Sequence, residues 1–144
     1  ILVILLPSPN KKEEVVNLSC LLRNKELEKF IFDLMEIQNQ IKIYHWQTKM
    51  YGKHKALDEL FDELVDKVDE IAEIGMGKYD RVDASGITFT FKNFSDAELT
   101  GTISTCINLC IDLKLDSSVD SDILNLRDEL LGKLNQTKYL LTLK

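Results

Sequence analysis

Both histidines of the chain, His45 and His54, stand in one short stretch together with carboxylates at helical spacing. Asp58 follows His54 by four residues, and Asp69 and Glu73 form a second pair at the same spacing. Residues four apart share a face of a helix, with their Cβ atoms about 5–6 Å apart. Imidazoles and carboxylates on packed helices are ligands that proteins use for iron or manganese. The pattern therefore indicates a metal site built between helices.

The spacing divides these five residues into two half-sites. His54 and Asp69 would lie about 22 Å apart along a helix, so one ion cannot contact both within one chain. His45, at the end of the preceding helix, can approach His54 and Asp58 across a short turn. We expect Asp69 and Glu73 of a second copy to complete the site in an antiparallel twofold dimer.

Other interpretations of the same residues remain open. On the helical wheel the acids flank the apolar stripe, so they face solvent or another subunit. A run of acids is often only a solvated face, and a histidine often only satisfies a hydrogen bond. Cys106 and Cys110 share a helix face and are expected to be buried thiols.

Apolar residues at helical spacing predict an all-α protein with four long helices. The predicted helices cover residues 24 to about 51, 53–75, 95–115 and 119–141, and the first is either separate from or continuous with a segment starting at Lys11. Gly75 and Gly77 are expected to end the second helix, and the alternating run Ile87–Phe91 is compatible with a short strand. The predicted organisation is an N-terminal arm or short helix, residues 1–23, and a four-helix bundle domain, residues 24–144, with a long connection between helices 2 and 3.

Composition narrows the classes of function. The net charge of −6 disfavours nucleic-acid binding. Three cysteines favour a reducing compartment, and a cytoplasmic location is expected. The apolar run ILVILL is too short for a membrane span, which needs roughly 20 residues, so we expect no membrane association and an extended arm docked on a neighbour.

The site residues resemble those of the mini-ferritins, the Dps family. In that family a His-Trp pair ends the first helix, a second histidine opens the next, an Asp follows four residues later, and an Asp-x-x-x-Glu pair lies further along. The matching residues here are His45-Trp46, His54, Asp58, Asp69 and Glu73. The turn between the two histidines is about three residues shorter than is usual in the family. The C-terminal KYLLTL also looks similar to the end of the family's fourth helix. The sequence further resembles compact mini-ferritin-like proteins associated with viruses, which would imply a virion-associated location.

The resemblance implies a ferritin-like bundle that assembles into a dodecameric shell through twofold interfaces and stores iron. Ferrous iron would be oxidised between subunits by peroxide or dioxygen. His45, His54, Asp58, Asp69 and Glu73 would bind the iron, and Trp46 would donate electrons, unless it only packs. Acids near the last turn would line an acidic pore or serve helix capping and solubility; these are Asp112, Asp116, Asp120 and Asp122. The alternative is a catalytically inactive structural or assembly protein, for example a cage or virion component, and a third option is a dimanganese bundle.

Overall fold

The computed structural model describes residues 11–144, and their side chains from residue 18 onward. Within this range the chain forms four α-helices and no strand: α1 (Lys11–Gln47), α2 (Tyr51–Lys78), α3 (Asp96–Ile111) and α4 (Ser121–Leu140). The all-α prediction is confirmed. The expected strand at Ile87–Phe91 is wrong, because that segment meets no second strand in the described part of the chain.

Helix α1 is a single helix of 37 residues. The prediction of a continuous helix from Lys11 is confirmed, and Asn24 lies inside the helix instead of capping it. No proline or glycine interrupts the sequence between Lys11 and Gln47, so nothing breaks the hydrogen-bond ladder. The boundary expected at residue 23 therefore falls within α1. The helix ends at Gln47, earlier than predicted.

Helix α2 runs through the two glycines that were expected to end it. Gly75 and Gly77 both lie inside α2, and the helix is closed by the N–H of Tyr79, which donates to the Gly75 carbonyl at 2.8 Å. Gly75 is buried because α1 approaches closely there: a Cβ on Gly75 would lie 2.6 Å from Leu27 Cδ2. This glycine serves close helix packing rather than termination.

The start of α3 follows the predicted capping box. The Ser95 side chain accepts a hydrogen bond from the Glu98 N–H at 3.0 Å. Cys106 and Cys110 are both fully buried on one face of α3, which confirms their prediction as buried thiols. The helix ends at Ile111, a turn before the predicted end.

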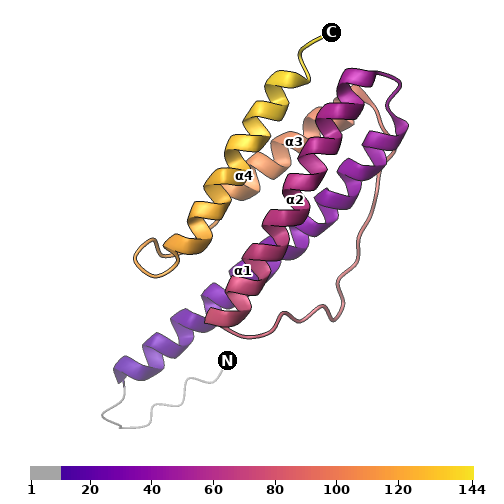
Figure 1. The fold of residues 1–144 in the computed structure, drawn as a ribbon. Helices are drawn as coiled ribbons and strands as arrows, with labels where there is room; N and C mark the ends of the chain where they lie inside the picture. Colours follow the sequence, from indigo (N-terminus) through magenta and orange to yellow (C-terminus); the bar gives the residue numbers. More distant parts are fainter. Residues whose placement is uncertain (1–10) are drawn as a thin grey trace.

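The four helices pack around one apolar core. Helix α1 contacts α2 and α3, and α4 contacts the same two helices. Figure 1 shows the segment between α2 and α3 running back along the length of the molecule, so that α2 and α3 point the same way. Fully buried residues from all four helices form the core, among them Leu34, Ile41, Leu57, Leu64, Ile71, Cys106, Ile123, Leu130 and Leu134.

Residues 79–95 form this connection, and polar side chains of α1 hold it in place. Four backbone N–H groups of the connection donate to side chains along α1. The pairs are Asp83 with Glu28, Thr90 with Glu36, Lys92 with Gln40 and Phe94 with Gln47. These bonds give the backbone N–H groups of the connection the acceptors that a neighbouring strand would give them in a sheet. They explain how an alternating sequence stays extended without a sheet.

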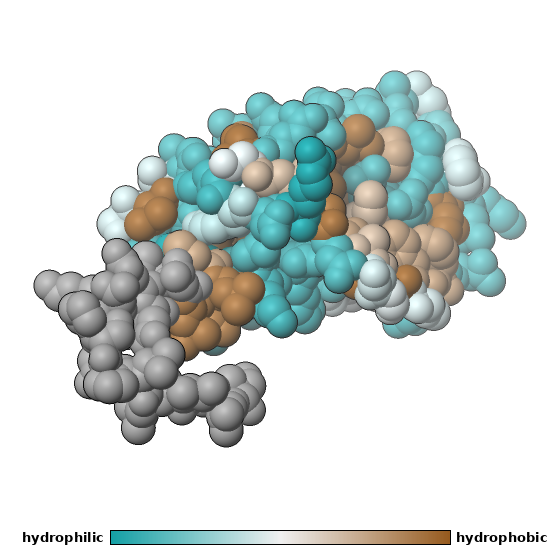
Figure 2. Space-filling model, turned by 90° about the horizontal axis from the view of Figure 1, so that it is seen from below, coloured by the Kyte–Doolittle hydropathy of each residue, from teal (hydrophilic) through white to brown (hydrophobic). Residues whose placement is uncertain are grey.

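Apolar side chains are exposed on the N-terminal part of α1. Leu18, Leu21 and Leu22 all face outward. Figure 2 views the molecule from this end and shows hydrophobic surface there. The arm predicted from ILVILL lies outside the described residues. None of the helices in residues 11–144 has the length and apolar character of a membrane span.

Candidate functional site

The two histidines meet at the turn between α1 and α2. Only three residues separate Gln47, the last residue of α1, from Tyr51, the first of α2. This short turn stacks the imidazole of His45 on that of His54, with ring centroids 3.8 Å apart and an interplanar angle of 19°. His45 is 7% exposed, and His54 is partly buried.

Each imidazole is fixed by the backbone of the other histidine. His45 Nδ1 lies 2.8 Å from the carbonyl oxygen of His54, and His54 Nδ1 lies 2.9 Å from the carbonyl oxygen of His45. A carbonyl oxygen only accepts, so both Nδ1 atoms carry the proton. In the neutral ring the lone pair then lies on Nε2, the nitrogen left available for a ligand.

Asp58 lies beside this pair. One of its carboxylate oxygens, Oδ1, is 3.7 Å from His45 Nε2 and also 3.7 Å from Lys42 Nζ. Lys42 is held over the ring of Phe61, with its ammonium 4.5 Å from the centroid. The fold thus stacks His45 on His54 and places one Asp58 oxygen near His45 Nε2, with the Lys42 ammonium equally near that oxygen.

Asp69 and Glu73 lie elsewhere on the same helix. Helix α2 is continuous from Tyr51 to Lys78, so its rise keeps Asp69 about 22 Å from His54. Both acids are exposed, as are Asp62 and Asp66. Within the described residues, no three His, Cys, Asp or Glu side chains converge as a metal-binding group. The five predicted ligands therefore form two separate clusters in one chain.

Aromatic side chains surround the histidine end of the molecule. Trp46 is 69% exposed, so it does not fill the core of this chain. Tyr51 is also exposed, and its ring centroid lies 6.4 Å from that of His54. Of these two rings, Tyr51 lies nearly parallel to the His54 ring, at an interplanar angle of 27°.

A buried polar cluster at the opposite end was not predicted from the sequence. Asp120 is fully buried, accepts a hydrogen bond from the Tyr79 hydroxyl, and lies 3.1 Å from Lys78 Nζ. Arg23 Nε faces it at 3.8 Å, and neither Arg23 Nε nor Asp120 Oδ2 has a hydrogen-bond partner among the described residues. The spacing of these residues along the chain carries no periodic signal, so only the fold reveals the cluster.

The cluster shifts the ionisation of its members. Burial and the neighbouring Asp120 carboxylate raise the pKa of Tyr79. For Lys78, burial lowers the pKa, but hydrogen bonds to Asp122 and Asp120 outweigh it and the net pKa is raised. The hydrogen bond from Lys78, at 2.7 Å, lowers the pKa of Asp122. Asp120 is thus engaged within the chain and does not face an outer pore.

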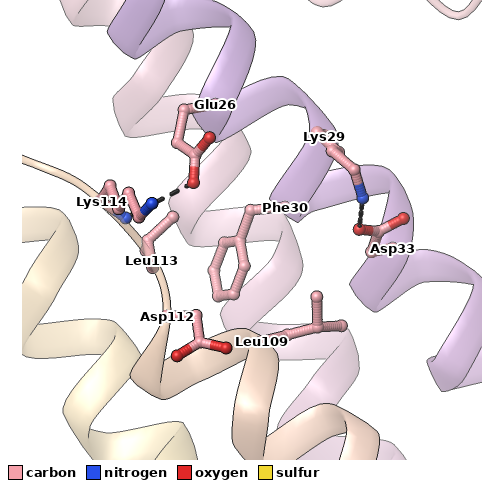
Figure 3. A pocket seen from close by; sticks show the side chains of 8 residues that line it. All are labelled: Glu26, Lys29, Phe30, Asp33, Leu109, Asp112, Leu113 and Lys114. Atoms are coloured by element: carbon pink, nitrogen blue, oxygen red, sulfur yellow. Dashed lines mark hydrogen bonds and ion pairs between the residues drawn. The ribbon is translucent and has the colours of Figure 1, made fainter.

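A separate hollow of about 270 Å³ lies between α1 and the end of α3. Figure 3 shows Phe30 of α1 and Leu109 of α3 among its lining side chains, with the carboxylate of Asp112 at one side. Lys29 pairs with Asp33 at 2.5 Å, and the Lys114 N–H donates to Glu26 at 3.5 Å. The charged side chains Lys29, Asp33 and Glu26 are thus engaged, and no histidine or cysteine lines this hollow.

Neither the curated proteins nor the solved structures include a match to this chain. One family of unknown function, DUF5856, matches residues 45–141. The matched range begins at His45 and includes His54, Asp58, Asp69 and Glu73. Because this range covers more than half of the sequence, the chain belongs to the family of unknown function DUF5856.

Proposed function

We propose that the protein oxidises and stores iron as a mini-ferritin-like cage, with each oxidation site shared between two copies. One copy supplies His45, His54 and Asp58, and its twofold partner supplies Asp69 and Glu73. Ferrous iron is the substrate, and the stored product is ferric oxide. Trp46, which is exposed and follows His45 in the sequence, is the proposed donor of the second electron when only one ferrous ion meets the oxidant.

The observation that most supports this proposal is the pair of hydrogen bonds between each histidine ring and the backbone carbonyl of the other histidine. Each Nδ1–H is held by the other residue's carbonyl, which leaves both Nε2 lone pairs free, that of His45 at 3.7 Å from the Asp58 carboxylate. Second-shell hydrogen bonds of this kind orient histidine ligands in metal sites. Nitrogen and carboxylate donors suit iron. A purely structural stacked pair would not need both Nε2 atoms to stay unbonded.

The arrangement of the helices also supports the proposal. Helices α2 and α3 run in the same direction and are joined by a connection that follows the length of the molecule (Figure 1). This is the order expected of a ferritin-like bundle with one long crossover. The exposed acids of α2 face outward, where a partner can reach them.

The proposed chemistry needs only ligands and an oxidant. Two ferrous ions give one electron each to one hydrogen peroxide molecule. With two protons, the peroxide is reduced to two molecules of water. The carboxylates offset the charge of the ferric product, and the neutral imidazoles fix the position of the ion. Hydrolysis of ferric iron then deposits the oxide inside the shell.

The first test is ferrous oxidation followed by absorbance with peroxide or dioxygen. We expect His54→Ala and Asp58→Ala each to lower the initial rate at least about tenfold, because each removes a ligand. Asp62→Ala is the matched control, since Asp62 is an exposed acid one turn from Asp58. Equal rates for Asp58→Ala and Asp62→Ala would exclude the proposed site.

A mixing experiment tests whether the site is shared. A dimer of one His54→Ala chain and one Asp69→Ala chain has one doubly damaged site and one intact site. Random reassociation of the two inactive variants is expected to restore about a quarter of the wild-type rate, because half of the dimers are mixed. Mixtures that stay as inactive as their components would show that the site lies within one chain.

A structural assembly protein without turnover is the second candidate function. The ion pair of Lys42 with Asp58 favours it, because an ammonium already occupies part of the space beside the carboxylate. In that case the wild-type protein would assemble, but ferrous iron would oxidise no faster with it than in buffer. Elemental analysis of the purified protein would identify manganese if that is the bound metal.

A further inference from the structure

The connection between α2 and α3 has two backbone edges, of which α1 uses only one. The N–H groups of Thr90, Lys92 and Phe94 all donate to side chains of α1. The Lys92 carbonyl also faces α1, where it accepts from Gln40 Nε2 at 2.8 Å. In an extended chain the N–H and C=O groups of successive residues point to opposite sides. The backbone N–H and C=O groups of the even-numbered residues therefore face α1, and those of the odd-numbered residues face away, although the Asn93 side chain accepts a hydrogen bond from Gln47 Nε2 of α1 at 2.9 Å.

The outward edge has no partner within the described residues. Phe89, Phe91 and Asn93 donate none of the backbone hydrogen bonds found there, and their carbonyls accept none. The extended segment is bounded at one end by the turn at Gly86, whose φ is 77°, and at the other by the Ser95 cap of α3. It forms a short free edge that is fixed on a rigid helix.

Apolar side chains accompany this edge. Ile87 is 45% exposed and Phe91 is 43% exposed. The rings of Phe89 and Phe91 lie 6.3 Å apart in an edge-on arrangement. The one charged side chain of the segment, Lys92, pairs with Glu98 of its own chain at 3.2 Å. A second copy of the segment therefore meets backbone donors, backbone acceptors and apolar groups, and no uncompensated like charge.

We propose that residues 87–93 pair with the same residues of a second copy as a two-stranded antiparallel ribbon across a twofold axis. The register that uses all three free N–H groups places Phe91 opposite Phe91 of the second copy and Phe89 opposite Asn93. An antiparallel pair of identical strands is self-complementary, as an isologous contact requires. Exposed strand edges otherwise promote uncontrolled association, and here the connection to α1 limits the edge to one short segment.

This contact is independent of iron binding. It uses no histidine and no acid of the candidate site, so it can exist in an active or an inactive protein. The edge by itself is smaller than the standard interface of about 1,600 Å². Association through it alone should be weak, and the test therefore traps the contact covalently.

Cysteine cross-linking tests the register. In a Cys20→Ser background, Phe91→Cys places two thiols on residues whose Cα atoms would be about 5.5 Å apart, within the range for a disulfide. We expect a reducible covalent dimer under mild oxidation, formed at least about tenfold faster than with Thr88→Cys. Thr88 is equally accessible, but its symmetry mate would be about 20 Å away in this register. The proposal would be overturned if the Thr88→Cys variant cross-linked as fast as the Phe91→Cys variant. It would also be overturned if neither variant cross-linked.

A pair of proline variants tests which edge is used. Phe91→Pro removes an outward N–H, whereas Lys92→Pro removes one that α1 uses. We expect Phe91→Pro to weaken self-association by about tenfold or more in sedimentation while keeping the melting temperature, and Lys92→Pro to lower the melting temperature. Unchanged association in a folded Phe91→Pro protein would contradict the edge pairing. If the Phe91→Cys chains cross-link but the protein does not oxidise ferrous iron, only the proposed function is contradicted. If the protein oxidises ferrous iron but the chains do not cross-link, only this inference is contradicted.

Discussion

At the scale of single residues, the histidine site depends on backbone carbonyls as much as on side chains. His45 and His54 are each locked by the other's carbonyl, so a change in the length of the turn would release both rings at once. The turn here is shorter than in the mini-ferritins that the sequence resembles. The short turn brings the two rings into contact, stacked with their centroids 3.8 Å apart.

Lys42 is the residue that opposes cation binding most directly. Its ammonium lies 3.7 Å from the Asp58 carboxylate. Two unit charges about 4 Å apart interact by about 1 kcal/mol in water, so Lys42→Met should lower the half-saturating ferrous concentration about fivefold. Methionine keeps an apolar stem over Phe61. Initial oxidation rates over a range of iron concentrations measure this, with Lys49→Met as the control; an unchanged value would remove Lys42 from the site.

Asp122 makes a pH-dependent contribution to stability. Its hydrogen bond from Lys78 lowers its pKa below the ordinary value of 3.8. A carboxyl with a lowered pKa stabilises the folded state above its unfolded pKa, and this stabilisation is lost as the pH falls through the folded value. We therefore expect Asp122→Asn to cost less than about 1 kcal/mol at pH 7. The difference from wild type should shrink as the pH falls below about 4 and disappear only below the lowered folded pKa of Asp122. Urea unfolding at several pH values checks this. A gap that persists in acid would point to hydrogen bonding alone.

At the scale of elements, helices were predictable where local signals decide them. The apolar stripe and the Ser95 cap gave four helices with correct centres, because those signals are periodic or lie within one turn. The end of α2 was not predictable, because Gly75 is explained by a contact with Leu27 on another helix. The alternation of Ile87–Phe91 is compatible with a strand, but the partners of this segment are side chains of α1, which the sequence does not indicate. Contacts between distant residues leave no local pattern in the sequence.

The candidate functional site was also predictable only where residues lie close in the sequence. Helical spacing paired His54 with Asp58, and the short turn was expected to bring His45 near them; in the structure His45 stacks on His54 and lies 3.7 Å from Asp58. The carbonyl locks, the Lys42 ion pair and the buried Asp120 cluster depend on how the elements meet in space, and the sequence did not indicate them.

The cluster around Asp120 joins α1, the end of α2 and the start of α4. Asp120→Ala would leave the Tyr79 hydroxyl, Lys78 and Arg23 without their shared carboxylate in a buried setting. Breaking a buried pair in this way typically costs about 3–5 kcal/mol. Asp116→Ala, which removes only two exposed turn bonds, from the N–H and the hydroxyl of Ser118, should cost much less. Chemical denaturation compares the two, and similar losses would mean that burial of Asp120 is unimportant for stability.

Two glycines of the helices should respond oppositely to alanine. Gly132 lies in the middle of α4 with nothing within 4 Å of an added Cβ. Gly132→Ala should stabilise the protein by about 0.5–1 kcal/mol through helix propensity. Gly75→Ala forces the buried Leu27 side chain to move, so the gain should be absent or reversed. Equal stabilisation by both changes in urea unfolding would show that α1 and α2 pack less closely there.

At the scale of the whole molecule, both intermolecular proposals require copies related by a twofold axis. One chain places its histidines at one end of α2 and Asp69 and Glu73 well along the same helix, so a single copy would hold only half of the proposed shared site. The free backbone edge of the connection also needs a copy to pair with. The first arrangement is a catalytic requirement and the second is a structural one. An assembly can satisfy both in one dimer or through different surfaces.

The native mass decides whether such an assembly exists. By resemblance to the mini-ferritins, light scattering at neutral pH should give a mass of about twelve chains, built from twofold dimers. Asp69→Ala should keep this mass while lowering iron oxidation, because the exposed Asp69 is assigned to the metal and not to packing. A dimer that oxidises iron would retain the shared site without the shell. A stable monomer that still oxidises iron would place the whole reaction on His45, His54 and Asp58, and would contradict the assignment of Asp69 and Glu73.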